Sequence, residues 1–83
     1  MLDYILQRHA GGPPRYYRVE VSYNLFGEYS VLREWGAMGG RGRGAELVVW
    51  FSNLREACGA ADRWRKRAQY RGYSTASIKG LGV

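Results

Sequence analysis

The hydrophobic pattern changes its period near residue 51, and this change limits the chain to folds in which strands precede a single helix. Before that point apolar and polar residues alternate. In the clearest segment, Tyr17, Val19, Val21 and Tyr23 face one way and the intervening residues, mostly polar, face the other. This alternation is typical of a half-buried strand. We therefore predict a strand over residues 16–23.

Three further strands are predicted, around residues 2–7, 28–35 and 47–51. Residues 11–14 (Gly-Gly-Pro-Pro) break the chain after the first strand, and residues 24–27 have the length of a hairpin connection. The segment 47–51 is apolar on both faces, which predicts a central strand. Neither face of 28–35 is purely apolar, so the sequence leaves open which of them meets the core.

After residue 51 the apolar residues recur at helical spacing, as Leu54, Ala57, Cys58, Ala61, Trp64 and Ala68. Asn53, followed by Glu56, has the layout of a capping box, with Ser52 as the competing cap. Gly72 is a natural helix stop. We expect a helix over about residues 53–71.

The predicted fold is α+β: an antiparallel sheet of four to five strands with one helix packed on one face. The 83 residues are enough for one domain, residues 1–83, with a single core. Trp50, Trp64 and Cys58 are expected in that core. The tail, residues 74–83, is expected either to add an edge strand or to fray.

A glycine- and arginine-rich run begins at the end of the third predicted strand and continues beyond it: Arg33-Glu34-Trp35-Gly36-Ala37-Met38-Gly39-Gly40-Arg41-Gly42-Arg43-Gly44. Glycine permits close approach of the backbone to another molecule. The guanidinium groups of Arg41 and Arg43 suit phosphate, and the ring of Trp35 is a flat apolar surface. The run therefore favours a nucleic-acid partner. Alternatively, Trp35 packs as a core or edge-strand residue and the arginines are solvated.

The chain is basic, with a net charge of +6 that comes from eleven arginines and two lysines against seven acids. Excess positive charge supports phosphate binding, and arginine adds bidentate geometry. The end of the predicted helix carries Arg63, Lys66, Arg67 and Arg71. These cations either touch phosphate or complement the helix dipole on a solvated face.

The remaining composition excludes several classes of function. One cysteine and one histidine cannot form a zinc site, so no metal or cofactor is expected. The acids are scattered and no nucleophile–base layout is present, so we predict a binding module and not an enzyme. There is no apolar run of about 20 residues and no signal-peptide pattern. We expect a cytoplasmic protein without membrane contact.

The order of elements and their residues resemble the WGR domain family, named for a Trp-Gly-Arg tripeptide. The matching segments are Arg15-Tyr16-Tyr17-Arg18-Val19, then Gly27 to Gly36 ending in Arg33-Glu34-Trp35-Gly36, then Met38-Gly39 and the helix ending in Arg71-Gly72-Tyr73. The resemblance covers roughly residues 4–73. Small bacterial proteins that consist of little more than this domain share the arrangement.

The resemblance implies a DNA-binding role. In DNA-damage-sensing poly(ADP-ribose) polymerases, members of this family contact DNA near a strand break, with the tryptophan against the terminal nucleotide. Trp35 and Gly36 occupy the matching positions. The third tripeptide position is Ala37, so the family's arginine is missing. Arg41 or Arg43 is a candidate to replace it from the loop.

We therefore predict a DNA-binding module with little base-sequence specificity that prefers ends or nicks. Its expected contact residues are Trp35, Gly36, Arg33, Arg41, Arg43, Lys66, Arg67 and Arg71. Phosphate contacts fix register without reading sequence. The alternative is a protein-interaction module with no direct nucleic-acid role, and a third possibility is a homodimer formed through an edge strand or the tyrosine-rich surface.

Overall fold

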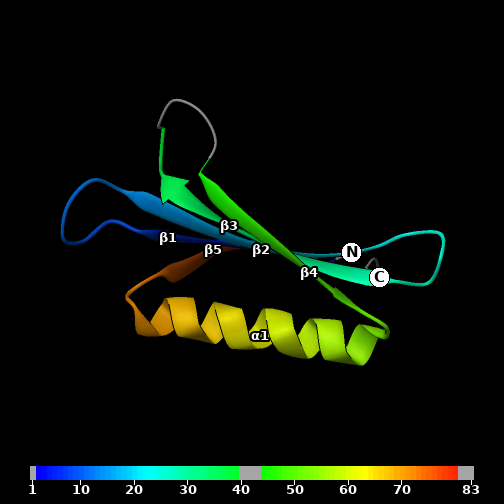
Figure 1. Cartoon of the computed structure of the whole chain (residues 1–83). Helices are drawn as coiled ribbons and strands as arrows, with labels where there is room; N and C mark the ends of the chain where they lie inside the picture. Colours follow the sequence, from blue (N-terminus) through cyan, green and yellow to red (C-terminus); the bar gives the residue numbers. More distant parts are fainter. Residues whose placement is uncertain (1, 40–43, 81–83) are drawn as a thin grey trace.

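Five strands and one helix make up the fold in a computed structural model that describes residues 2–39 and 44–80. In chain order they are β1 (Leu2–Arg8), β2 (Arg15–Tyr23), β3 (Tyr29–Ala37), β4 (Ala45–Phe51), α1 (Leu54–Tyr70) and β5 (Ser74–Lys79). The strands form one sheet in the order β4-β3-β2-β1-β5, with every neighbouring pair antiparallel. The α+β prediction is confirmed (Figure 1).

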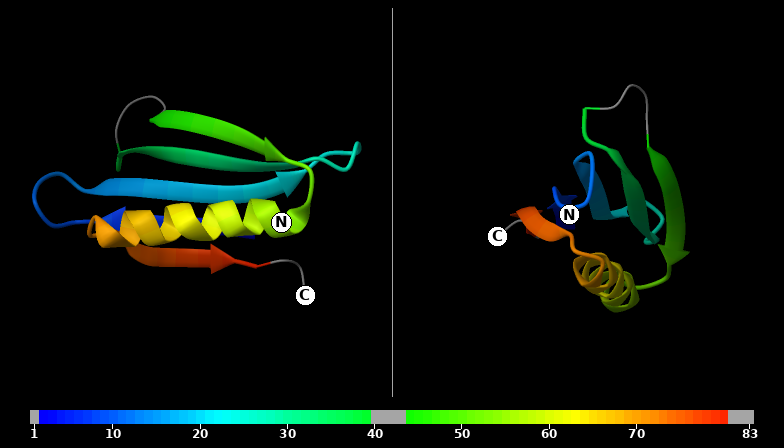
Figure 2. Two further views of the ribbon diagram at one scale, coloured as in Figure 1. Left: turned by 60° about the horizontal axis from the view of Figure 1, so that its bottom comes forward. Right: turned by 90° about the vertical axis from the view of Figure 1, so that its left-hand side faces the viewer.

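Helix α1 lies across one face of the sheet and leaves the other face uncovered (Figure 2). The main core is formed where Val19, Val21 and Val31 of the sheet meet three alanines of the helix, Ala57, Ala60 and Ala61. The alanines let the helix approach the sheet closely, and each buried valine contributes about 1.5–3 kcal/mol. Trp64 packs against this cluster partly buried, as predicted, whereas Cys58 is only half-buried.

The burial of Val31 settles the orientation of β3. Because side chains alternate along a strand, Tyr29, Arg33 and Trp35 lie on the same face as Val31, toward the helix. The sequence left this choice open, since both faces of the strand mix polar and apolar residues. The structure thus places Arg33 and Trp35 on the side of the sheet that carries the core.

Both ends of α1 form as the sequence predicts. The side chain of Asn53 accepts a hydrogen bond from the backbone N–H of Glu56 at 2.8 Å, so Asn53 is the cap. At the other end Gly72 adopts φ +96°, and the N–H of Tyr73 donates to the carbonyl of Ala68 at 3.1 Å. This Schellman turn directs the chain back toward the sheet. Tyr73 then joins Leu6 and Ala68 in a second buried cluster.

The prediction that residues 47–51 form a central strand is wrong. Strand β4 forms an edge of the sheet, and the side chain of Trp50, expected in the core, is 55% exposed. The physical reason is connectivity: β4 returns along β3 and the chain then leaves for the helix, so no later strand within residues 44–80 pairs with its outer side. The tail forms β5 on the opposite edge, beside β1.

Candidate nucleic-acid interface

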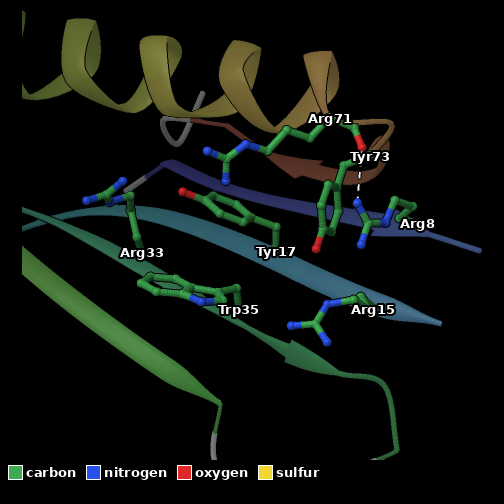
Figure 3. A pocket seen from close by; sticks show the side chains of 7 residues that line it. All are labelled: Arg8, Arg15, Tyr17, Arg33, Trp35, Arg71 and Tyr73. Carbon is green, nitrogen blue, oxygen red and sulfur yellow. Dashed lines mark hydrogen bonds between the residues drawn. The ribbon is translucent and has the colours of Figure 1, made fainter. Parts of the chain in front are cut away.

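A cavity of about 430 Å³ opens between the C-terminal end of α1 and the sheet. Four arginines and three aromatic residues line it: Arg8, Arg15, Tyr17, Arg33, Trp35, Arg71 and Tyr73 (Figure 3). Among the described residues that line it there is no acidic side chain. The volume lies in the range of about 300–1,000 Å³ that is usual for small-ligand sites.

The register of the sheet brings these residues together from four segments of the chain. Arg8 of β1 stands opposite Arg15 of β2, and Arg15 stands opposite Ala37 of β3. In the next same-face row, Tyr17 stands opposite Trp35. Arg71 and Tyr73 follow the helix and close the cavity from the side of β5. The site therefore depends on pairing between strands that are distant in sequence.

The aromatic rings form a continuous wall. Tyr17 and Trp35 are stacked, with ring centroids 6.0 Å apart and planes inclined by 17°. Tyr73 meets Tyr17 edge-on, with centroids 5.8 Å apart. Trp35 is half-buried. The sequence offered two interpretations of Trp35, as a flat surface for a ligand and as a packed residue of the strand. Both are compatible with the structure, because the ring packs against Tyr17 and also lines the cavity.

Aromatic faces also hold two of the arginines in place. The guanidinium carbon of Arg33 lies 4.1 Å from the ring centroid of Trp64, and that of Arg8 lies 4.9 Å from the centroid of Tyr73. Arg8 also donates a hydrogen bond from Nη1 to the carbonyl of Arg71 at 3.2 Å. Cation–π contact orients a guanidinium group without neutralising its charge.

The cavity is strongly cationic because its arginines have no acidic partners. Among the described residues, no carboxylate lies within ion-pair distance of any of the four. The Nε atom of Arg33 is buried and has no hydrogen-bond partner within residues 2–39 and 44–80. The directly opposed Arg8 and Arg15 carry like charges, which is a destabilising cross-strand pair. A bound anion would accept a hydrogen bond from Nε of Arg33 and would reduce the repulsion between Arg8 and Arg15.

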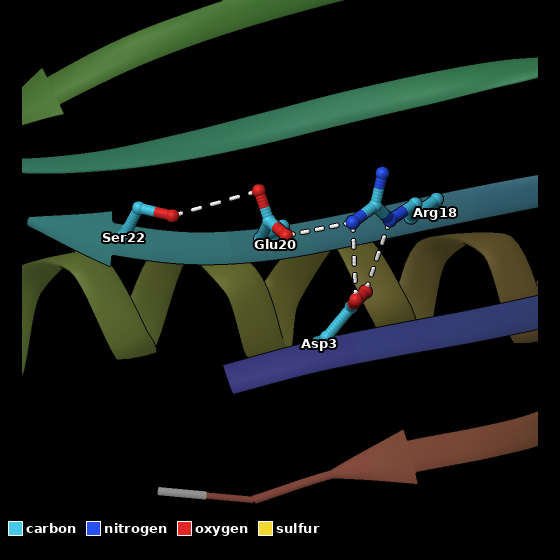
Figure 4. A network of polar contacts seen from close by, with 4 residues as sticks. All are labelled: Asp3, Arg18, Glu20 and Ser22. Carbon is cyan, nitrogen blue, oxygen red and sulfur yellow. Dashed lines mark hydrogen bonds and ion pairs between the residues drawn. The ribbon is translucent and has the colours of Figure 1, made fainter. Parts of the chain in front are cut away.

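The opposite face of the sheet has the reverse character. There Arg18 is held by Asp3, at 3.2 and 3.1 Å, and by Glu20 at 2.6 Å; Ser22 extends the network (Figure 4). The hydrogen bond from Arg18 to Asp3 is the main reason that the pKa of Arg18 is raised. The four acids of β1 to β4 all lie on this face: Asp3, Glu20, Glu34 and Glu46. Charge is thus segregated between the two faces.

The structure brings only some of the predicted DNA-contact residues together at the cavity. Arg33, Trp35 and Arg71 line the cavity. Lys66 and Arg67 are exposed on α1 and do not line it, and Lys66 pairs with Asp62 at 3.0 Å. Gly36 is buried, and a Cβ atom built there would lie 3.1 Å from the Cα of Gly44 and 3.3 Å from the ring of Tyr16 on the uncovered face. Arg41 and Arg43 lie outside the described residues.

Sequence reasoning missed four residues of the site: Arg8, Arg15, Tyr17 and Tyr73. A signal for two of them was present, since Arg8 and Arg15 flank the Gly-Pro breaker and therefore end and begin paired strands. Tyr17 belonged to the predicted core face, and Tyr73 followed the helix stop. Nothing in the linear pattern placed these two beside Trp35.

Other kinds of site find no support in the described part of the chain. Within residues 2–39 and 44–80 no group of three histidine, cysteine or acidic side chains is close enough to hold a metal ion. The helix is neither long nor apolar enough to cross a membrane, as judged over the same residues.

Comparison with protein families identifies the chain. The model of the WGR domain matches residues 3–79, so the protein belongs to the WGR domain family. The match extends past the predicted segment, residues 4–73, at both ends and includes strand β5. Comparison with curated proteins and with solved structures gave no match. The WGR domain is a nucleic-acid-binding type of domain.

Proposed function

We propose that this WGR domain binds DNA with little base-sequence specificity and prefers an exposed nucleotide at an end or a nick. The observation that carries the proposal is the cavity, in which four arginines without acidic partners among the described residues surround three aromatic rings. Phosphate and a planar base are the two features that every nucleotide offers to such groups. Because the described part of the lining holds arginines and no acid, it favours an anionic ligand.

The size of the cavity supports a preference for ends. A volume of about 430 Å³ is typical of a site for one small ligand, so we expect one nucleotide to enter it and not a stacked duplex. In a continuous duplex each nucleotide is held by backbone on both sides, whereas a nucleotide at a nick or an end is held on one side only and leaves the stack at a lower cost. Arg8, Arg15, Arg33 and Arg71 would contact its phosphates, and Trp35 its base or sugar. Lys66 and Arg67 would make peripheral contacts, whereas Gly36 is buried and would not reach the nucleotide.

Arg15 is a new candidate to replace the arginine that the family carries at the position of Ala37. In the β2–β3 register Arg15 stands directly opposite Ala37, where Cβ atoms lie about 4.5–5.5 Å apart. Its guanidinium group lines the cavity. Arg41 and Arg43, which lie outside the described residues, stay candidates from the loop. Comparing Arg15→Gln with Arg41→Ala and Arg43→Ala would separate these proposals.

The test is a fluorescence-anisotropy titration with nicked, blunt-ended and closed-hairpin DNA at several salt concentrations. If three to five phosphates are neutralised, the log–log slope of affinity against salt is about −3 to −5. Stacking of a base contributes about 1–3 kcal/mol, so Trp35→Ala should weaken binding to nicked DNA by about 5- to 150-fold. Trp50→Ala, on the uncovered face, is the matched control and should leave binding unchanged.

The same titration can refute the proposal. A slope near zero would exclude phosphate contacts as the basis of binding. Equal affinity for nicked and closed DNA, with no effect of Trp35→Ala in a folded variant, would exclude the end-binding mechanism.

The alternative function is a protein-interaction module with no direct nucleic-acid role. The tip of the β2–β3 hairpin favours it, because Leu25 and Phe26 are 98% and 87% exposed. The tip is ordered by Asn24, whose side-chain oxygen accepts from the backbone N–H groups of Phe26 and Glu28. If DNA binding fails in the titration above, this tip becomes the first surface to mutate.

A further inference from the structure

Among the described residues no strand pairs with the outer edge of β4, although the composition of the strand is that of a central strand. Leu47 and Val48 are 43% exposed and Trp50 is 55% exposed, so apolar side chains stand in solvent on both faces. We propose that this edge is an interface between two copies of the chain. In the proposed dimer β4 pairs antiparallel with β4 of the second copy, across a two-fold axis at Val48, and joins two five-stranded sheets into one.

The two edges of the sheet differ in a way that supports this inference. Free edges are normally protected from pairing by lysine, proline, bulges or short length. The β5 edge has such protection: it ends in Lys79, and its register with β1 shifts between Ile5 and Leu6. Strand β4 contains no lysine, arginine or proline over its seven residues, and its pairing with β3 is regular.

Strand β4 is also self-complementary. Two residues that stand opposite each other in an antiparallel pair lie on the same face, so a two-fold axis must pass through a residue. An axis at Val48, the middle residue, uses the full strand. The resulting pairs are Val48 with Val48, Leu47 with Val49, Ala45 with Phe51, and Glu46 with Trp50. The only charged side chain in the strand, Glu46, meets an aromatic ring, so no like charges are opposed.

The expected strength and salt dependence follow from size and charge. An interface one strand wide buries less than the about 1,200–2,000 Å² of a standard stable complex, so we expect association in the micromolar range. Each copy carries a net charge of +6, and salt screens their repulsion. Dimerisation should therefore strengthen with salt, whereas DNA binding should weaken. This opposite response separates the present inference from the proposed function.

Sedimentation velocity of the full chain, from low micromolar to submillimolar concentration, tests the interface. We expect a reversible monomer–dimer equilibrium that Val48→Lys weakens at least tenfold, because it opposes two lysines at the axis. Ile78→Lys is the matched control, since Ile78 is 56% exposed on the β5 edge. Circular dichroism checks that both variants fold. A monomer at all concentrations, or equal effects of the two variants, would overturn the proposal.

Disulfide trapping tests the register. In a Cys58→Ala background, Val48→Cys places the two thiols directly opposite each other, and oxidation should give a covalent dimer. Leu47→Cys meets Val49 of the second copy and should be trapped much more slowly, although it is equally exposed. If Leu47→Cys is trapped as fast as Val48→Cys, the proposed register is wrong.

Discussion

At the scale of single residues, the unusual feature is the pair of arginines that stand opposite each other on β1 and β2. Arg8 and Arg15 are directly cross-strand, and neither has an ion-pair partner among the described residues. Like charges in this position cost stability. Together with Arg33 and Arg71, this pair gives the cavity a local excess of positive charge that a bound anion would balance.

We predict that Arg15→Gln lowers DNA affinity while leaving the free protein as stable or more stable. Removing one phosphate contact should make the salt slope shallower by about 1. Relief of the repulsion with Arg8 should raise the free energy of unfolding by about 0.2–1 kcal/mol. Anisotropy and urea denaturation measure the two effects. Arg55→Gln, at an exposed site in the first turn of α1, is the control for charge alone.

Gly44 is a second residue whose identity has a structural reason. A Cβ atom built there would overlap the carbonyl oxygen of Trp35 and lie 2.7 Å from its carbonyl carbon, both on the neighbouring strand. These atoms belong to the backbone and cannot rotate away. Glycine is therefore required for β3 and β4 to approach each other beside the cavity.

We predict that Gly44→Ala destabilises the fold by about 1–3 kcal/mol, the cost of an overpacked site. Urea denaturation would measure the loss. Gly80→Ala is the matched control, because a Cβ atom at Gly80 meets nothing within 4 Å and no positive φ is involved. Equal stability of the two variants would mean that the strands separate without cost.

At the scale of elements, α1 carries its own charge pattern. Asp62 is paired with Arg65 three residues later and with Lys66 four residues later. Hydrogen bonds from Arg65 and then from Lys66 hold the pKa of Asp62 below its ordinary value of 3.8. A carboxyl group with a lowered pKa stabilises the folded state above its unfolded pKa, and this stabilisation is lost as the pH falls through the folded pKa.

The sign of the shift predicts that the helix loses support only in acid, below about pH 4. The side chain of Asp62 is 38% exposed, and helix pairs at the surface contribute only about 0.3–0.5 kcal/mol. Urea denaturation at pH 6 and at pH 2.5 should show a slightly smaller loss of stability for Asp62→Asn than for the natural chain. An identical pH dependence in the two proteins would contradict the prediction.

At the scale of the whole molecule, charge is divided between the two faces of the sheet. The helix-side face carries Arg8, Arg15 and Arg33 without a strand acid, and the uncovered face carries all four strand acids. The net charge of +6 alone would attract any polyanion. Because the positive and negative side chains lie on opposite faces of the sheet, we expect an anionic partner to approach the helix-side face.

Two double variants distinguish DNA binding in the cavity from attraction of DNA by the net charge of the protein. One double variant combines Arg33→Gln with Arg71→Gln, and the other combines Lys66→Gln with Arg67→Gln. Both remove two positive charges, but only Arg33 and Arg71 line the cavity. We predict that the first double variant loses at least tenfold more DNA affinity than the second, as measured by anisotropy at fixed salt. Thermal unfolding would confirm that both are folded. Equal losses would mean that net charge, and not the cavity, governs binding.

The sequence by itself determined strands β1 to β4, the helix and their order, because these depend on local chemistry, and it left open whether the tail forms a strand. Alternation along 16–23, the cap at Asn53 and the stop at Gly72 each reflect an interaction within a few residues, and all three are present in the structure. The sequence also singled out Trp35, Arg33 and Arg71, which line the cavity.

Only the tertiary structure decided what depends on pairing between distant segments. It placed β4 at an edge, because strand order follows from connections and not from composition. It chose the helix side for Trp35, because the mixed faces of β3 are distinguished only by the core against which they pack. It brought Arg8, Arg15, Tyr17 and Tyr73 around Trp35 through cross-strand register, which no local pattern encodes.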